Sequence, residues 1–138
     1  MLEQLQAMVR GEDEGPPIAR LIGFRLMVIE PGEAVVELQA DGRHANPMGT
    51  LHGGVLCDIA DAAMGIAYAS LLEDDETFTT LEMKINYVRP LRREAGEVRC
   101  EASVIHVGGR VATAEGRIVD ANGKLYAHGT ATCMLFRE

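Results

Sequence analysis

Apolar and polar residues alternate along two parts of the chain, before and after one long apolar segment. Residues 24–30 and 33–40 alternate on either side of Pro31-Gly32, which predicts two strands joined by a tight turn. Four further strands are expected after the apolar segment, with turns at Gly108-Gly109 and 120–123, in the ranges 79–87, 96–107, 110–120 and 124–136.

The apolar segment itself, residues 53–72, predicts a single long helix. A helix that is apolar on nearly all sides is buried. One helix cannot cover both faces of a sheet, but a curved antiparallel sheet can wrap around it. We therefore expect an α+β fold with a sheet of about five to six strands around one central helix.

The first 22 residues predict a separate helical segment. Residues 2–10 fit a short amphipathic helix, residues 11–17 a loop, and Pro17 opens a second short helix because proline suits a first helical turn. The chain has 138 residues, enough for one core. We therefore treat 1–138 as a single domain, with 1–22 as its N-terminal helical segment.

Composition excludes several classes of protein. The net charge is −8, from 13 Lys and Arg against 21 Asp and Glu, which is the opposite of a nucleic-acid binder. No stretch approaches the roughly 20 apolar residues that span a bilayer. The first ten residues lack the apolar run of a signal peptide, so we expect a cytoplasmic protein. The widely spaced Cys57, Cys100 and Cys133 predict neither a disulfide framework nor a metal site.

The segment 44–54 places a polar loop and two glycines directly before the apolar helix. Helix starts carry unpaired N–H groups and partial positive charge. Glycine there lets a ligand approach the backbone, and an oxygen that becomes negative during a reaction is a natural occupant. An ordinary helix start with two flexible glycines, Gly53 and Gly54, is the alternative.

Two carboxylates, Asp58 and Asp61, interrupt the apolar helix on one side. Their stripe must face water, a subunit interface or a site, because burying an unpaired carboxylate costs several kcal/mol. Asp61 follows His52 by nine residues, so the two start on opposite sides and about 13.5 Å apart along the axis. One copy could hardly bring Asp61 to its own Gly53, whereas a two-fold homodimer could.

The run Asn46 to Asp61 (NPMGTLHGGVLCDIAD) resembles the signature of hotdog-fold acyl-CoA thioesterases of the phenylacetate-pathway, PaaI-like branch. The run Thr80 to Pro90 (TLEMKINYVRP) resembles the strand that follows the helix in that family, and the closing strands fit as well. The likeness spans most of residues 20–136. It implies a sheet wrapped around one helix and a homodimer, commonly paired into a homotetramer.

The resemblance also implies roles for residues of this chain. Asp61 matches the catalytic carboxylate, and Gly53 matches the residue whose backbone N–H polarises the thioester carbonyl. Asn46 and His52 match polar residues that orient the carbonyl or the water. The implied reaction is hydrolysis of an acyl-CoA to the free acid and CoA. CoA is then part of the substrate, and no cofactor or metal is expected.

A Ser/Thr position that helps to place the water matches Thr80, with Thr79 as the fallback because the register is uncertain by one. A related branch carries Glu at position 61 and Thr four residues later, where this chain has Gly65. That difference favours the Asp-type branch. It leaves open whether Asp61 attacks directly or acts as a general base, which we favour.

Arginines are the natural partners of the CoA phosphates, because a planar guanidinium matches a phosphate group. The candidates follow the strand after the helix or lie at a hairpin, and they are Arg89, Arg92, Arg93 and Arg110. Solvated surface arginines are the alternative. The remaining histidines show no ligand spacing and are expected to be structural or surface residues: His44, His106 and His128.

Two other functions remain open. A hydratase or dehydratase acting on an enoyl thioester would need a His and an acid at the carbon chain, and the helix offers no His. A non-catalytic acyl-CoA binder would bind without releasing a thiol. Assays of enoyl-CoA hydration and of thiol release separate these alternatives.

Overall fold

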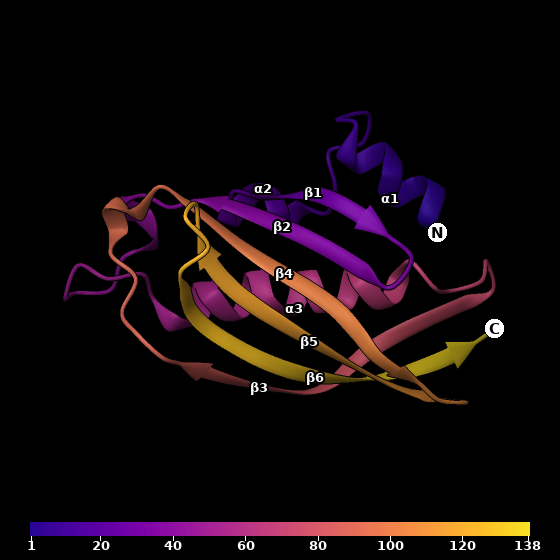
Figure 1. Ribbon diagram of the computed structural model, residues 1–138. Coiled ribbons are helices and arrows are strands. Elements are labelled where there is room, and N and C mark those ends of the chain that lie inside the picture. Colours follow the sequence, from indigo (N-terminus) through magenta and orange to yellow (C-terminus); the bar gives the residue numbers. More distant parts are fainter.

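A six-stranded antiparallel sheet curves around the longest helix in the computed structural model, which describes residues 1–138 (Figure 1). The spatial order is β1-β2-β4-β5-β6-β3, so β1 and β3 form the two edges. The strands are β1 (Phe24–Glu30), β2 (Glu33–Gln39), β3 (Glu76–Tyr87), β4 (Glu97–Val107), β5 (Val111–Asp120) and β6 (Leu125–Arg137). The expected α+β arrangement of two strands, one helix and four strands is confirmed.

The central helix α3 spans Gly53–Ala69 and lies along the inner side of the sheet (Figure 1). Its sheet-facing residues Ile59, Ala63 and Ala67 are completely buried, and two of the three are alanines, which lets the helix backbone approach the strands. Burial of a side chain such as Ile59 stabilises the fold by about 1.5–3 kcal/mol. The helix ends three residues before the predicted 72, where the Ser70 hydroxyl donates to the Ala67 carbonyl at 2.7 Å.

The edge strand β3 contains a β-bulge that changes which side chains face α3. Thr80 pairs with Cys133 but Glu82 pairs with Thr132, so Leu81 is the extra residue. Before the bulge even-numbered side chains such as Phe78 and Thr80 are partly covered, and after it odd-numbered ones such as Met83 are. The uninterrupted period of two read from 79–87 is therefore wrong at this point.

The N-terminal segment forms the two short helices that were predicted, α1 (Leu2–Val9) and α2 (Pro17–Ile22). Leu5 of α1 is 5% exposed and belongs to the hydrophobic core. Helix α2 ends at Gly23, whose φ of 94° is left-handed and turns the chain into β1. Two 3-10 turns complete the structure, η1 (Gly42–His44) and η2 (Arg93–Ala95). No helix has the length and apolar character needed to cross a membrane.

Candidate active site

Asp61 and Thr80 meet between α3 and the edge strand β3. The Thr80 hydroxyl donates a hydrogen bond of 3.0 Å to Asp61 Oδ1. This contact depends on the bulge at Leu81, which turns Thr80 toward the helix, whereas Thr79 is exposed on the outer face of the strand. The geometry thus brings Thr80, and not Thr79, to the carboxylate.

Cys133 lies opposite Thr80 on β6 and is buried. Burial raises the pKa of its thiol, the hydrogen bond with Thr80 opposes that rise, and the negative charge of Asp61 adds to it. The thiol is therefore held protonated. A protonated, buried thiol is inert as a nucleophile, so Cys133 supplies no nucleophile to this cluster.

A cavity of about 320 Å³ opens beside Asp61. Its inner wall is apolar and is formed by β1, α3 and β3 through Phe24, Leu26, Ala62, Ile66 and Phe78. Its outer wall comes from the N-terminal segment, through Met8, Asp13, Glu14, Pro16, Ile18 and Ala19. No pattern in the sequence indicated that this segment borders the site, because the contact depends on where α1 and α2 pack.

The start of α3 presents an unused backbone donor. Gly53 is the first helical residue, so its N–H has no intrahelical acceptor, and no hydrogen bond of the loops uses it. The N–H of Gly54 donates instead to His52 Nδ1 at 2.9 Å, which caps the helix. The His52 side chain is otherwise exposed.

Tyr87, which the sequence showed only as a strand residue, holds this helix start in place. Its hydroxyl donates to the Gly53 carbonyl oxygen at 2.8 Å and lies 3.1 Å from Cys57 Sγ. Burial, followed by the contact with Cys57, raises the pKa of Tyr87 to about 12, so the hydroxyl stays protonated. A Cβ at Gly53 would lie 3.0 Å from that hydroxyl, which explains the glycine.

Asn46 organises the loop before the helix. Its amide nitrogen donates to Thr50 Oγ1 at 2.7 Å, and its Oδ1 accepts from the N–H groups of Met48 and Thr50 at 3.0 and 3.2 Å. These bonds close the loop 46–50. Within one protomer the Asn46 side chain does not contact Asp61.

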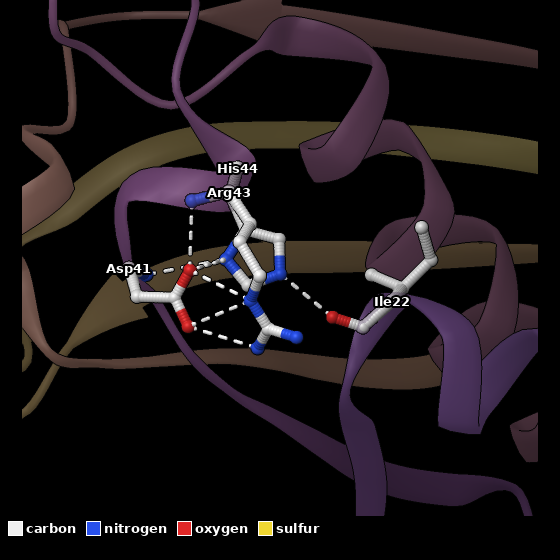
Figure 2. A network of polar contacts seen from close by, with 4 residues as sticks. All are labelled: Ile22, Asp41, Arg43 and His44. Atoms are coloured by element: carbon white, nitrogen blue, oxygen red, sulfur yellow. Dashed lines mark hydrogen bonds and ion pairs between the residues drawn. The ribbon is translucent and has the colours of Figure 1, made fainter.

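A buried histidine, His44, anchors the chain just before this loop (Figure 2). The Asp41 N–H donates to His44 Nδ1 at 3.2 Å, and the opposite ring nitrogen, Nε2, donates to the Ile22 carbonyl at 2.7 Å. The His44 carbonyl in turn accepts from the His52 N–H at 2.8 Å. His44 is thus the structural residue that was predicted, and it fixes the chain that leads to the helix cap.

Three basic side chains gather around a second cavity of about 600 Å³, and they are Arg89, Arg92 and Lys124. Arg89 also lies over the Tyr126 ring, 5.9 Å from its centroid. A third cavity of about 420 Å³ borders Gly53 and shares Val88, Arg89 and Pro90 with the basic one. A continuous surface therefore leads from the helix start to the basic side chains. Lys124 was missed because it belongs to the β5–β6 turn, distant in sequence.

The other two candidate arginines lie differently. Arg93 is paired with Glu94 at 3.1 Å. Arg110 belongs to the β4–β5 hairpin, and its carbonyl oxygen accepts a hydrogen bond from the Leu135 N–H, near one end of β6. The Arg89 N–H donates to the Tyr126 carbonyl oxygen, near the other end of β6. Residues 126 and 135 are separated by about 30 Å along β6 at 3.3 Å per residue. Within one protomer Arg110 therefore lies at the opposite end of the sheet from Arg89.

Asp61 and Gly53 do not share a site within one protomer. Eight residues of helix separate them by about 12 Å along the axis. The cavity beside Asp61 and the cavity beside Gly53 have no lining residue in common. No cluster of three or more His, Cys, Asp or Glu side chains is placed to hold a metal ion.

Comparison with known proteins identifies the family. The sequence model described as the thioesterase superfamily matches residues 48–127, and the chain belongs to this superfamily. The 1,4-dihydroxy-2-naphthoyl-CoA hydrolase of Listeria monocytogenes serotype 1/2a (strain 10403S) is 36% identical over 104 residues, which is 75% of this chain and 83% of that protein. The human acyl-coenzyme A thioesterase 13 is 26% identical over 136 residues, covering 96% and 94%.

The structural comparison narrows the class to hotdog-fold proteins of the PaaI-like branch. A mutant of the phenylacetic acid degradation protein PaaI from Thermus thermophilus superimposes with a TM-score of 0.78 at 32% identity, covering 86% of this chain and 98% of that one. The resemblance found in the sequence is thereby confirmed. Relatives named thioesterases and hydrolases support a thioester hydrolase.

Proposed function

We propose that this protein hydrolyses acyl-CoA thioesters to the free acid and CoA. The observation that carries the proposal is the hydrogen-bonded pair Asp61 and Thr80 beside a cavity with an apolar inner wall, in a chain of the thioesterase superfamily. The apolar inner wall accepts the acyl group, and the Asp61 carboxylate is close enough to activate a water that attacks the thioester carbonyl carbon.

In the proposed reaction Asp61 acts as the general base. It takes a proton from a water held by Thr80, and the water oxygen bonds to the thioester carbon. The carbonyl oxygen becomes negative and is stabilised by the Gly53 N–H at the start of a helix, with Asn46 and His52 orienting the carbonyl or the water. When the C–S bond breaks, the CoA thiolate takes up the proton that Asp61 removed from the water, and the free acid leaves.

The two halves of this site come from two copies of the chain in the proposal, because Asp61 and Gly53 face separate cavities within one protomer. The edge strand β3 supports this assembly. It has twelve residues, its outer edge is unpaired, and it carries the 52% exposed Leu81. Antiparallel pairing of two β3 edges gives a two-fold homodimer. Pairing of two dimers gives the expected homotetramer.

The basic cavity is the proposed place for the CoA phosphates. Arg89, Arg92 and Lys124 supply three positive charges, and the surface between them and Gly53 suits the pantetheine arm. Arg93 is engaged by Glu94, and Arg110 lies far from this cavity in the same protomer. In an assembly Arg110 would have to serve the site of another copy.

A complementation experiment tests the shared site. Asp61→Asn removes the base, and Gly53→Pro removes the N–H at a helical position that accepts proline. Gly53→Ala adds the same Cβ near Tyr87 but keeps the N–H, so it is the matched control. We expect Asp61→Asn to lower kcat at least about 10²-fold, the lower range for loss of a general base.

Neither the Asp61 nor the Gly53→Pro variant should be active alone. Co-refolding them should recover up to about a quarter of wild-type activity, because half of the dimers are mixed and each mixed dimer has one intact site of two. Thiol release from phenylacetyl-, hydroxybenzoyl-, dihydroxynaphthoyl- and hexanoyl-CoA reports activity. No recovery would refute the shared site, and binding without thiol release by the wild type would refute the hydrolase.

A further inference from the structure

Apart from Ala19 of α2, the outer wall of the cavity beside Asp61 is made by a single stretch of chain, the segment 8–18, which runs from the last turn of α1 to the first turn of α2. Met8, Pro16 and Ile18 give it apolar contact surface, and Asp13 and Glu14 give it charge. Together with Ala19, the segment closes this cavity on the side that the central helix and the sheet leave open. Whatever enters the cavity must therefore lie against it.

Local contacts hold the segment in a defined shape. The Gly15 N–H donates to Asp13 Oδ1 at 2.8 Å, and Arg20 Nη1 donates to the Gly15 carbonyl at 3.1 Å. Gly15 has a left-handed φ of 75°, and a Cβ there would lie 3.0 Å from the end of Met8. The loop is thus folded tightly onto α1, which is itself anchored in the core by Leu5.

The charged residues around the cavity are unequal in sign. Four carboxylates line it, Asp13, Glu14, Asp58 and Asp61, against the single guanidinium of Arg25. Arg20 lies 3.6 Å from Glu14 but is not part of the lining. Their summed negative charge repels a negative group that enters the cavity, and because Glu14 and Asp61 are exposed, salt screens part of this repulsion.

We propose that the segment 8–18 is a selectivity element that excludes acyl groups whose far end is negatively charged. The inference rests on the proposed function, because it takes the acyl group of a thioester to be the occupant of this cavity. Neutral apolar or aromatic acyl groups bury their carbon chain against Ile66 and Phe78. A terminal carboxylate would have to lie among like charges or lose its water against an apolar wall, and both are costly.

A matched pair of substrates tests the proposal on the full-length protein. Hexanoyl-CoA and adipoyl-CoA have chains of equal carbon number, but adipoyl ends in a carboxylate. We expect kcat/KM to be at least about tenfold higher for hexanoyl-CoA, with the ratio falling as salt screens the charges. The double variant Asp13→Asn and Glu14→Gln should lower this ratio at least about threefold, because two of the four carboxylates are neutralised.

Glu12→Gln is the control, because Glu12 belongs to the same loop and carries the same charge but does not line the cavity. It should leave the ratio of hexanoyl-CoA to adipoyl-CoA unchanged. A wild-type ratio near one, a preference for adipoyl-CoA, or equal effects of the double variant and the control would overturn the proposal. Absence of thiol release from both substrates would instead overturn the proposed function, and the selectivity with it.

Discussion

Replacing Thr80 by valine tests the contact at the centre of the site. The change keeps the shape and the strand propensity but removes the donor to Asp61 Oδ1 at 3.0 Å. A hydrogen bond to a charged group contributes about 1.5–3 kcal/mol when it is shielded from water. Asp61 is exposed, so water competes and about 1 kcal/mol is a better value. Lost in the transition state, that energy lowers kcat about fivefold.

Neighbouring substitutions give the controls. Thr79→Val makes the identical chemical change one residue earlier, on the outer face of β3, and should leave kcat unchanged. Thr80→Ser keeps the hydroxyl and should restore most of the lost rate. Steady-state thiol release and thermal melting of all three variants separate a catalytic effect from a folding effect. The reasoning fails if Thr79→Val is as damaging as Thr80→Val, or if Thr80→Val has wild-type kcat.

Three further outcomes are expected. Arg89→Ala should raise KM for acyl-CoA about tenfold, because it removes a charge-assisted contact worth about 1.4 kcal/mol. It should not change KM for an acyl thioester that lacks the nucleotide, and equal effects on both substrates would exclude a phosphate role. Burial raises the pKa of all three tyrosines, Tyr68, Tyr87 and Tyr126. The folded state then holds these protons more tightly, so stability should fall as pH rises above about 10. Tyrosinate absorbance of the native protein should appear at higher pH than that of the unfolded chain, and identical titrations of the two states would contradict this. The hydrogen bonds and charge of Arg43 hold the pKa of Asp41 at about 2. The ionised Asp41 therefore stabilises the fold above the pKa of the unfolded chain, and this stabilisation is lost as pH falls from about 4 toward 2. The melting temperatures of wild type and Asp41→Asn should converge over that range, and a constant difference would contradict the prediction.

Local patterns in the sequence were sufficient for most of the fold. The turn at Pro31-Gly32 and the alternation on both sides predict β1 and β2 to within one residue of the observed bounds. The apolar run after His52 predicts α3, because a helix without a polar face must be surrounded by other elements. These features depend on residues close in sequence, and periodicity reports them directly.

Sequence periodicity does not report features that arise from contacts between residues far apart in the sequence. The bulge at Leu81 reverses the facing of β3, and nothing in an alternating strand marks where an extra residue is inserted. Lys124 lies near Arg89 because β6 pairs with β3. Arg110 lies at the opposite end of the sheet, which its position in the sequence does not reveal. The wall formed by residues 8–18 depends on how α1 docks on the sheet.

The position of the bulge connects the fold to the proposed chemistry. Without the extra residue, side chains would alternate between the two faces along the whole strand. If Met83 and Ile85 still faced the helix, Thr79 would then lie beside Asp61 in place of Thr80. The bulge lets the second half of β3 bury Met83 and Ile85 while the first half directs Phe78 into the cavity and Thr80 to the carboxylate. It also lies on the unpaired edge that the proposed dimer uses. A register shift of one residue in that pairing would therefore displace the partner's helix start from Asp61, so the same strand that aligns the catalytic pair must also align the two protomers.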